Sequence, residues 1–532
     1  MKNSSKFISL FLLGLVAFGC SSGVDVTFNL IDPCSEVVLL HEGQCQHIQV
    51  TISSLDPQDP LHQDPLPRIC DITQGSCNIS GDELLGVARM VDILCFTTLD
   101  TPPVARASSQ VMLFDTSADG IGTRTINLLI GNINEFADTT IVDSNSPDWG
   151  NCSYMGQGEI GRYGHSATLL DDGSVLIVGG IRRYGQGVEE ILTTAEVFDP
   201  VTGEHRIITG SDGNPIKMMA PSGRAFHTAT RLRDGRVLLT GGIGLVEGKK
   251  STLQSAELFD PFTGSFGATS VMGSGRAHHS ATSLATGEVL ITGGASYNNG
   301  VIASYFNNAI IYKPQTNTFE QVSSNMSVAR AFHAAVLLDP TTYNGNVVVI
   351  GGENVDGPHN SIDIYDAKGN KFYDNVNIVM SKNRSHLTAV RLNNGEVMVS
   401  GGKTTVDDIS VDNGVEIFDP SIVPFGGFIA QTLTLSVARM DHTATLLDTG
   451  NVLVAGGANA SNQGIGIADL VLIGSGTYSV QQLTDFVDPQ RLLHAATKLR
   501  NGWVLLSGGL PSRALEAMPI TQSMLFVPPQ SY

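Results

Sequence analysis

The chain has 532 residues, of which 42% are hydrophobic, 15% are charged and 58 are glycine, and its formal net charge is −20. The length allows two to four domains, and the composition is ordinary for a soluble protein rich in β-structure. A charge this negative argues against binding to nucleic acid, because phosphate contacts need clustered Lys and Arg, and against direct contact with anionic lipid.

The first residues predict export and lipidation. Lys2 and Lys6 accompany an apolar run, residues 7–19, that is too short to cross a bilayer. Residues 17–20 (AFGC) resemble a bacterial lipobox. The resemblance implies a signal peptide over 1–19, an anchor and spacer over 20–23 with Cys20 lipidated, and an outer-membrane lipoprotein, periplasmic or surface-exposed. The alternative is an ordinary signal peptide followed by a chance cysteine.

Residues 24–136 predict a small β-sandwich. Its candidate strands are separated by Pro or Gly clusters and lie at 24–30, 47–52, 84–93, 109–116 and 124–130. A translocated chain meets oxidising conditions, so three disulfides are expected, among Cys34, Cys45, Cys70, Cys77, Cys95 and Cys152. Five of these cysteines fall in the sandwich, which predicts that Cys152 ties it to the segment that follows. A zinc site would need tighter Cys/His spacing.

From residue 161 the sequence repeats one β-hairpin seven times. The first copy, GRYGHSATLLDDGSVLIVGG (161–180), predicts a strand, a tight turn at Asp172-Gly173, a second strand buried on both faces and a closing glycine pair. The closing pairs recur 50 to 62 residues apart, at Gly179, Gly241, Gly293, Gly351, Gly401, Gly456 and Gly508.

Further strands complete each period. TAEVFDPVTG (194–203) and SAELFDPFTG (255–264) predict a third strand and a turn, and TFEQV (318–322) is typical of a fourth. The pattern resembles the kelch repeat, which implies an all-β fold with a seven-bladed β-propeller over 161–532. The seventh copy lacks a fourth strand, so the linker at 137–160 is expected to supply a closing strand.

Most copies share Arg-x-x-His before the first strand. An Arg ring at the channel mouth could bind an anion, but repetition favours a structural role, with Glu196, Glu257 and Glu416 as partners. In the fifth copy Asn383 stands at the Arg position and His386 is grouped with the repeat histidines. The residues predicted to be structural are Arg162, His165, Gly179, Gly180, Arg224, His227, Gly241, Gly242, Arg276, His279, Gly293, Gly294, Arg330, His333, Gly351, Gly352, Arg439, His442, Gly456, Gly457, Arg491, His494, Gly508 and Gly509.

Loop lengths predict which face of the propeller binds. Strands in a blade alternate in direction, so the short turns share one face, and the long loops after each glycine pair share the other with the blade connections. Variable loops on a rigid scaffold commonly carry binding sites. The candidate contacts on this long-loop face are Arg182, Arg183, Tyr184, Tyr297, Tyr305, Phe306 and His359.

Metal and cofactor chemistry is not expected. Galactose oxidase-like proteins combine a kelch propeller with a copper site that has a Tyr–Cys crosslink, but this sequence has no Cys after Cys152. Two groups of oxygen-bearing side chains could be considered as calcium ligands: Asp407, Asp408, Asp412 and Asn413, and Asp115 with Asp119. The sequence indicates calcium binding only weakly, because neither group has EF-hand spacing.

The sequence therefore predicts a monomeric cell-envelope lipoprotein whose propeller binds protein or glycan without catalysis, through the long-loop face. It predicts no cofactor and no nucleic-acid partner. One alternative is a hydrolase, lyase or epimerase that acts on carbohydrate at the channel mouth. Unmatched carboxylates or His in a pocket would favour this enzyme, whereas an Arg ring neutralised by Glu would favour the binding module. A second alternative is a structural envelope protein.

Overall fold

The computed structural model describes the strands of the N-terminal part and most of the repeat region. The described residues are 23–31, 47–54, 66–71, 88–96, 105–112, 121–132, 136–138 and 161–528, with gaps at 185–186, 201–202, 211, 221, 407–409, 475, 484–488 and 527. Cys20, Cys34, Cys45, Cys77, Cys152, Asp115, Asp119, Asp407 and Asp408 lie outside these residues. No helix in this part of the chain is long and apolar enough to span a bilayer.

The described N-terminal strands form one six-stranded sheet in the order β1-β6-β5-β4-β2-β3. They are β1 (Gly23–Ile31), β2 (His47–Ser54), β3 (Leu66–Asp71), β4 (Ala88–Phe96), β5 (Ala105–Met112) and β6 (Ile121–Asn132). β1 pairs with β6 in parallel, and β3 was not anticipated from the sequence. The described residues include no second sheet facing this one, so the sandwich stays a prediction.

Strand register narrows the disulfide options. Cys70 in β3 and Cys95 in β4 both lie opposite Ile48 of β2, which runs between these two strands. Two strand spacings separate their Cα atoms by about 9.5 Å. A disulfide joins Cα atoms less than about 7 Å apart. A bond between Cys70 and Cys95 is therefore not expected.

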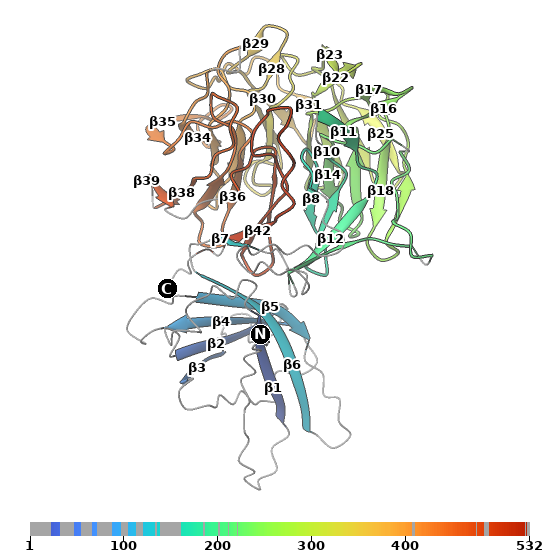
Figure 1. The fold of residues 1–532 in the computed structure, drawn as a ribbon. Helices are drawn as coiled ribbons and strands as arrows, with labels where there is room; N and C mark the ends of the chain where they lie inside the picture. Colours follow the sequence, from blue (N-terminus) through green and yellow to red (C-terminus); the bar gives the residue numbers. More distant parts are fainter. Residues whose placement is uncertain are drawn as a thin grey trace.

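Residues 161–526 form a seven-bladed propeller, and each blade is a four-stranded antiparallel sheet (Figure 1). The first four blades run outward through β8 (Ser166–Leu169), β9 (Val175–Val178), β12 (Ala195–Asp199) and β13 (Glu204–Ile207); β14 (Thr228–Arg231), β15 (Val237–Thr240), β18 (Ala256–Asp260) and β19 (Ser265–Ala268); β20 (Ser280–Ser283), β21 (Val289–Thr292), β24 (Ala309–Lys313) and β25 (Thr318–Gln321); and β26 (Ala334–Leu337), β27 (Val347–Ile350), β30 (Ile362–Asp366) and β31 (Lys371–Phe372).

The last three blades complete the circle. They comprise β32 (Thr388–Arg391), β33 (Val397–Ser400), β34 (Gly414–Asp419) and β35 (Gly427–Thr434); β36 (Thr443–Leu446), β37 (Val452–Ala455), β38 (Ala468–Ile473) and β39 (Tyr478–Leu483); and β40 (Ala495–Lys498), β41 (Val504–Ser507), β42 (Met524–Phe526) and β7 (Phe136–Asp138). Innermost strands contact their neighbours in turn, and β40 contacts β8. The seven predicted blades are confirmed.

The closing strand comes from the N-terminal side, but from an earlier position than expected. β7 pairs antiparallel with β42, with Ala137 opposite Leu525. It overlaps the expected segment, 137–160, only at its first two residues. A strand of three residues has no alternating pattern long enough to mark it in the sequence.

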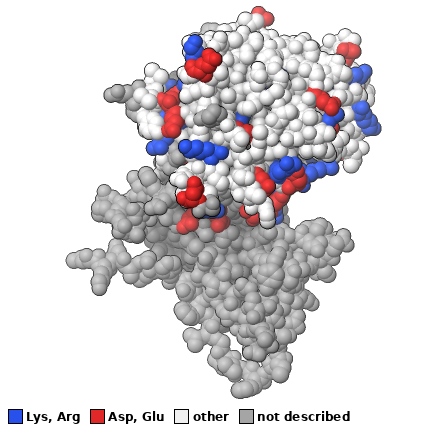
Figure 2. Space-filling view, turned by 90° about the vertical axis from the view of Figure 1, so that its right-hand side faces the viewer, with Lys and Arg blue, Asp and Glu red and all other residues white. Residues whose placement is uncertain are grey.

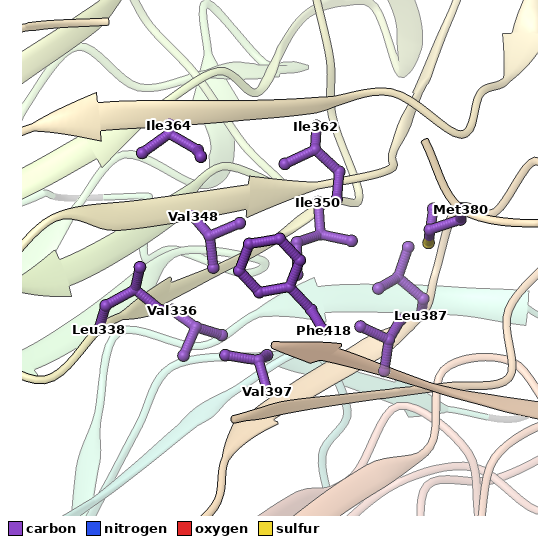
Figure 3. Packing of buried hydrophobic residues seen from close by; sticks show 11 residues of the cluster. Val336, Leu338, Val348, Ile350, Ile362, Ile364, Met380, Leu387, Val397 and Phe418 are labelled. Carbon is purple, nitrogen blue, oxygen red and sulfur yellow. The ribbon is translucent and has the colours of Figure 1, made fainter. Parts of the chain in front are cut away.

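The hydrophobic core lies between blades. The second strand of every blade is fully buried, as its run of apolar residues predicted. Between the fourth and fifth blades, Phe418 lies among Val336, Val348, Ile350 and Val397 (Figure 3). The last and first blades share another cluster, which includes Trp503. The circle is therefore closed by apolar packing as well as by β7.

Four short hairpins extend the long-loop face. They follow the glycine pairs of the first four blades and extend from the end of the propeller opposite β7 (Figure 1): β10 (Ile181–Tyr184) with β11 (Val188–Ile191), β16 (Ile243–Val246) with β17 (Lys249–Thr252), β22 (Ala295–Asn298) with β23 (Val301–Tyr305), and β28 (Glu353–Asn354) with β29 (Gly357–Pro358). Acidic and basic side chains lie beside one another in small groups on the side of the propeller seen in Figure 2.

Candidate functional site

A ring of seven residues surrounds the propeller axis at the long-loop face. In each blade, this residue directly precedes the position of the repeat histidine, and its φ is positive, between 52° and 63°. We call these residues the channel ring: Gly164, Phe226, His278, Phe332, His386, Asp441 and Leu493. Their backbones are joined from blade to blade, for example by Phe226 N–H donating to Gly164 O (2.8 Å) and His386 N–H to Phe332 O (3.0 Å). Six non-glycine residues in this left-handed region concentrate backbone strain at the channel, as is common at ligand sites.

A pocket of about 390 Å³ lies over the channel ring, near the lower end of the size range of small-molecule sites. Ring residues supply Phe226, His278, Phe332, His386, Asp441 and Leu493. The other lining residues come from the segment just before the ring and from the loops after the glycine pairs: Tyr163, Arg183, Tyr297, Glu353, Lys403, Leu510 and Arg513. Every blade therefore contributes a side chain, and the pocket lies on the propeller axis.

One side of the pocket wall is an arc of neighbouring rings that are tilted or stacked against one another. The ring centroids of Phe226 and His278 are 4.7 Å apart, those of His278 and Phe332 are 4.1 Å apart, and those of Phe332 and His386 are 4.0 Å apart. Tyr297 adds a contact to His278 at 5.7 Å. Burial, followed by repulsion from His386, lowers the pKa of His278 to about 3, so this imidazole is neutral.

Charged side chains elsewhere in the pocket neutralise one another. His386 Nδ1 lies 2.7 Å from Asp441 Oδ1, and Arg513 pairs with the other oxygen of this carboxylate. Lys403 Nζ lies 3.4 Å from Glu353 Oε2. Burial alone would raise the pKa of Asp441, but the pairing with His386 and Arg513 lowers it well below its usual range.

A second network holds the pocket edge at the first blade. Arg183 donates to Glu189 (2.8 Å) and to the carbonyl oxygen of Ala514 (2.8 Å), and its guanidinium lies 5.3 Å from the centre of the Tyr163 ring. Burial would raise the pKa of Glu189, but hydrogen bonds from Lys250, Tyr163 and Arg183 lower it to about 2. Arg183 thus joins the first blade to the loop of the last.

The repeated arginines are buried inside the blades and do not line the pocket. Arg162, Arg224, Arg276, Arg330, Arg384, Arg439 and Arg491 are at most 2% exposed. Five of them pair with a carboxylate at one position of the third strand: Glu196, Glu257, Asp363, Glu416 and Asp469. The other blades have Ile310 and Met524 at this position. The arginines thus belong to the blades, and the proposed anion site at their ring is not supported.

The repeat histidines bond between blades. Their Nε2 atoms contact hydroxyls of the preceding blade, as in His227 with Ser166 (2.8 Å), His333 with Thr292 (2.8 Å) and His494 with Thr443 (3.0 Å). Burial, followed by the neighbouring arginine, lowers the pKa of His494 to about 3. His279 and His442 have the same shift, again mainly because of burial.

These pKa shifts predict loss of stability in acid. Because the unfolded histidines titrate near pH 6.5 and the folded ones near 3, the unfolded state binds more protons in between. Stability is therefore complete above pH 6.5 and falls as pH drops toward 3, by up to about 1.4 kcal/mol per pH unit for each histidine. Urea midpoints at pH 7, 5.5 and 4 measure this fall. His494→Leu should reduce its slope, and an unchanged slope would contradict the assignment.

The fifth copy was aligned wrongly from the sequence. Arg384, not Asn383, is the repeat arginine, because its Nη1 donates to Gly401 O (2.8 Å) as Arg439 does to Gly456 O (2.9 Å). Leu387 therefore takes the position of the repeat histidine and packs in the core. His386 is not a structural histidine; it belongs to the channel ring and lines the pocket.

Two of the seven candidate contacts, Arg183 and Tyr297, line the pocket. Arg182 lies 4.8 Å from the centre of the Tyr184 ring, at the exposed hairpin. Tyr305 is half-buried on β23, and burial raises the pKa of its hydroxyl.

The remaining two candidates have contacts inside the blades. Phe306 packs 4.8 Å from the Arg276 guanidinium, in one of the two blades that lack the third-strand carboxylate. His359 Nδ1 is hydrogen-bonded to Ser361 (3.0 Å) beside Arg330. The pocket residues missed from the sequence include Asp441 and Arg513. For Asp441, the sequence signal was its position: it directly precedes a repeat histidine, where the residue differs from copy to copy.

One carboxylate of the acidic loop is already ion-paired, while Asp407 and Asp408 lie outside the described residues. Asp412 pairs with Lys382 (2.6 Å) and Arg384 (2.5 Å), which leaves it a poor calcium ligand. Among the described residues, no three His, Cys, Asp or Glu side chains are grouped to hold a metal ion.

Comparisons with known proteins point to the fold alone. No family profile and no curated protein matches the sequence. One similar solved structure is a novel fungal alcohol oxidase of the AA5 family in complex with copper, with 14% identity, a TM-score of 0.51 and coverage of 70% of this chain and 75% of that one. Another is YjhT, with 17% identity, a TM-score of 0.45 and coverage of 60% and 98%. The chain folds as a seven-bladed β-propeller, which agrees with the kelch-like repeat of its sequence.

A copper site of the galactose oxidase type needs a cysteine for its Tyr–Cys crosslink, and the sequence has none after Cys152. The channel ring, which lies on the axis, contains two histidines and no tyrosine.

Proposed function

We propose that this propeller is a binding module that takes a neutral, hydroxyl-rich ligand, such as the end of a glycan chain, into the pocket over the channel ring. The observation that carries the proposal is the pairing inside the pocket. Lys403 with Glu353, and Arg513 with Asp441, offer donors and acceptors without net charge. An ionic ligand would have to break these pairs, whereas a hydroxyl can donate to one member and accept from the other.

The surrounding surface supports contacts beyond the pocket. Of the fifteen large apolar side chains exposed in the described residues, twelve are in long loops or blade connections: Tyr184, Val188, Met219, Leu245, Val246, Val271, Val301, Val355, Val379, Val406, Leu515 and Met518. Only Phe262, Ile422 and Val423 lie on the short-turn face. Exposed apolar side chains gathered on one face favour that face for a partner.

The lipobox-like sequence supports a place for this module in a bacterial cell envelope, anchored through Cys20. Metabolic labelling with palmitate tests the anchor. The wild-type chain should be labelled and the Cys20→Ser chain should not, and equal labelling would contradict the anchor.

A glycan array with the soluble chain from Ser21 tests the pocket. We expect Lys403→Met and Tyr297→Ala to weaken binding of the selected glycan at least about tenfold, because each removes a pocket contact. Phe262→Ser, on the opposite face, is the control and should bind as wild type does. Equal binding by all variants, with unchanged melting temperatures, would move the site away from the pocket.

A further inference from the structure

One pocket histidine is held differently from all the repeat histidines. In His165, His227, His279, His333, His442 and His494, Nδ1 is buried without a hydrogen-bond partner in the described residues, while Nε2 is bonded. His386 shows the reverse. Its Nδ1 is bonded to Asp441, and its Nε2 has no partner among the described residues. The side chain lines the pocket.

The partner of His386 is built for this contact. Asp441 is 9% exposed, accepts from His386 Nδ1 at 2.7 Å and is held from the other side by Arg513. In the neutral imidazole, an ionised carboxylate on Nδ1 keeps the proton there and leaves the lone pair on Nε2. Phe332 stacks on the imidazole with an interplanar angle of 20°, which fixes its orientation.

These two residues are also where the repeat is broken. The fifth blade has Leu387 where the other blades have a histidine, and its histidine is one position earlier, in the channel ring. The next blade places Asp441 at the equivalent ring position, where the other blades have Phe, His, Leu or Gly. A pair of residues that serves to stabilise the blades would recur around the propeller, whereas the pair of His386 and Asp441 occurs once and lines the pocket.

We propose that His386 and Asp441 form a general-base dyad that hydrolyses a neutral carboxylic ester, such as an acylated sugar, in this pocket. The inference rests on the proposed function, because the acylated ligand must first bind there. His386 Nε2 accepts a proton from water as the water oxygen bonds to the ester carbonyl carbon. The tetrahedral oxyanion then expels the alcohol as the carbon–oxygen bond breaks, and the imidazolium returns the proton to this leaving oxygen.

The charges of the pocket suit this reaction. The paired groups give the pocket no net charge in the ground state. Arg513 and Lys403 line the same pocket and would stabilise an oxyanion that develops in it, which would favour the transition state over the substrate. Asp441 stabilises the imidazolium formed at the same moment.

Other reactions fit the lining less well. The pocket wall contains no Ser, Thr or Cys among its described residues, so water is the nucleophile that the site can offer. Glycoside hydrolysis requires a protonated carboxyl group as acid. In this pocket Asp441 accepts from His386 and Arg513 on its two oxygens, and Glu353 accepts from Ser385 (2.8 Å) beside Lys403.

The repeat itself provides variants that fit the backbone. Phe226 and Phe332 occupy the ring position of His386, and Leu493 occupies that of Asp441. His386→Phe and Asp441→Leu should therefore fold. We expect His386→Phe to lower kcat about 10²- to 10⁴-fold on p-nitrophenyl acetate and on a peracetylated hexose, followed by release of p-nitrophenolate and of acetate. Lys382→Met, a cation outside the pocket, is the control and should match wild type.

Asp441 acts through His386, so its role needs a separate readout. Asp441→Asn should lower kcat at least about tenfold with KM nearly unchanged, because the imidazole remains in place while its tautomer is no longer fixed. A change in KM alone would assign Asp441 to ligand binding and overturn its role in the dyad.

Two separate assays distinguish failure of the proposed binding function from failure of the proposed hydrolysis. Calorimetry with the non-acylated glycan chosen on the array reports the pocket as a binding site. Glycan binding with ester hydrolysis no faster than in His386→Phe would overturn the dyad and leave the proposed function intact. Absence of both would overturn both.

Discussion

Arg439→Met should destabilise the propeller by about 3–5 kcal/mol, which is a large fraction of the stability of an ordinary domain. Arg439 is fully buried and donates to Asp469 (2.8 Å), Gly456 O (2.9 Å) and Ile467 O (3.0 Å). Without the guanidinium, the Asp469 carboxyl group would lie in the interior with the Ser436 backbone N–H (3.3 Å) as its one remaining donor among the described residues. Urea unfolding measures the loss as a lower midpoint.

The third blade provides the matched control. Arg276 is equally buried, but its partners are neutral: Gly293 O (2.8 Å), Asn308 Oδ1 (3.1 Å) and the Phe306 ring. Arg276→Met leaves no buried carboxylate without its partner, so it should lower the free energy of unfolding by about 1–3 kcal/mol. Arg439→Met with Asp469→Ile should recover most of the larger loss, since Ile310 stands at the carboxylate position of the third blade. Equal losses for both single variants would show that the carboxylate is not what makes the arginine necessary.

The blades could be predicted from the sequence because each one is specified locally. An X-Gly turn, a run of buried apolar residues and a glycine pair recur together, and each depends on contacts within one hairpin or with the next. The same reasoning found Glu196, Glu257 and Glu416, but it missed Asp363 and Asp469. These two are equivalent by register, with Asp363 opposite Val349 and Asp469 opposite Val454. Allowing either carboxylate at this position would have found all five.

The pocket could not be predicted because it depends on what differs between copies. Its side chains come from seven blades and meet only when the circle closes, so no local pattern joins His386 to Asp441. A misreading of one residue also hid the histidine. Counting from the glycine pair would have corrected it, since Arg384 precedes Gly401 by the same 17 residues that separate Arg439 from Gly456. Leu387 would then have stood out at the histidine position, with His386 one place earlier.

Gly456→Ala should be comparably severe, with a loss of about 2–5 kcal/mol. Gly456 has a φ of +59°, where an L side chain costs about 1–2 kcal/mol. A Cβ there would also lie 2.6 Å from the carbonyl oxygen of Arg491 and 2.6 Å from His494 Cε1, both in the next blade. Neither group can withdraw: this carbonyl accepts from Gly457 N–H (2.8 Å), and His494 is bonded to Thr443. Overpacking at such a contact adds about 1–3 kcal/mol.

Gly395→Ala separates strain from crowding. Gly395 also has a positive φ, +89°, but a Cβ there would meet nothing within 4 Å. The loss at this turn should stay near 1 kcal/mol, because lower entropy of the unfolded chain offsets part of the strain. Equal melting temperatures for the two variants would mean that the glycine pair serves the left-handed conformation alone. A much larger loss at Gly456 would show that the pair is needed because the next blade's arginine carbonyl and histidine approach so closely.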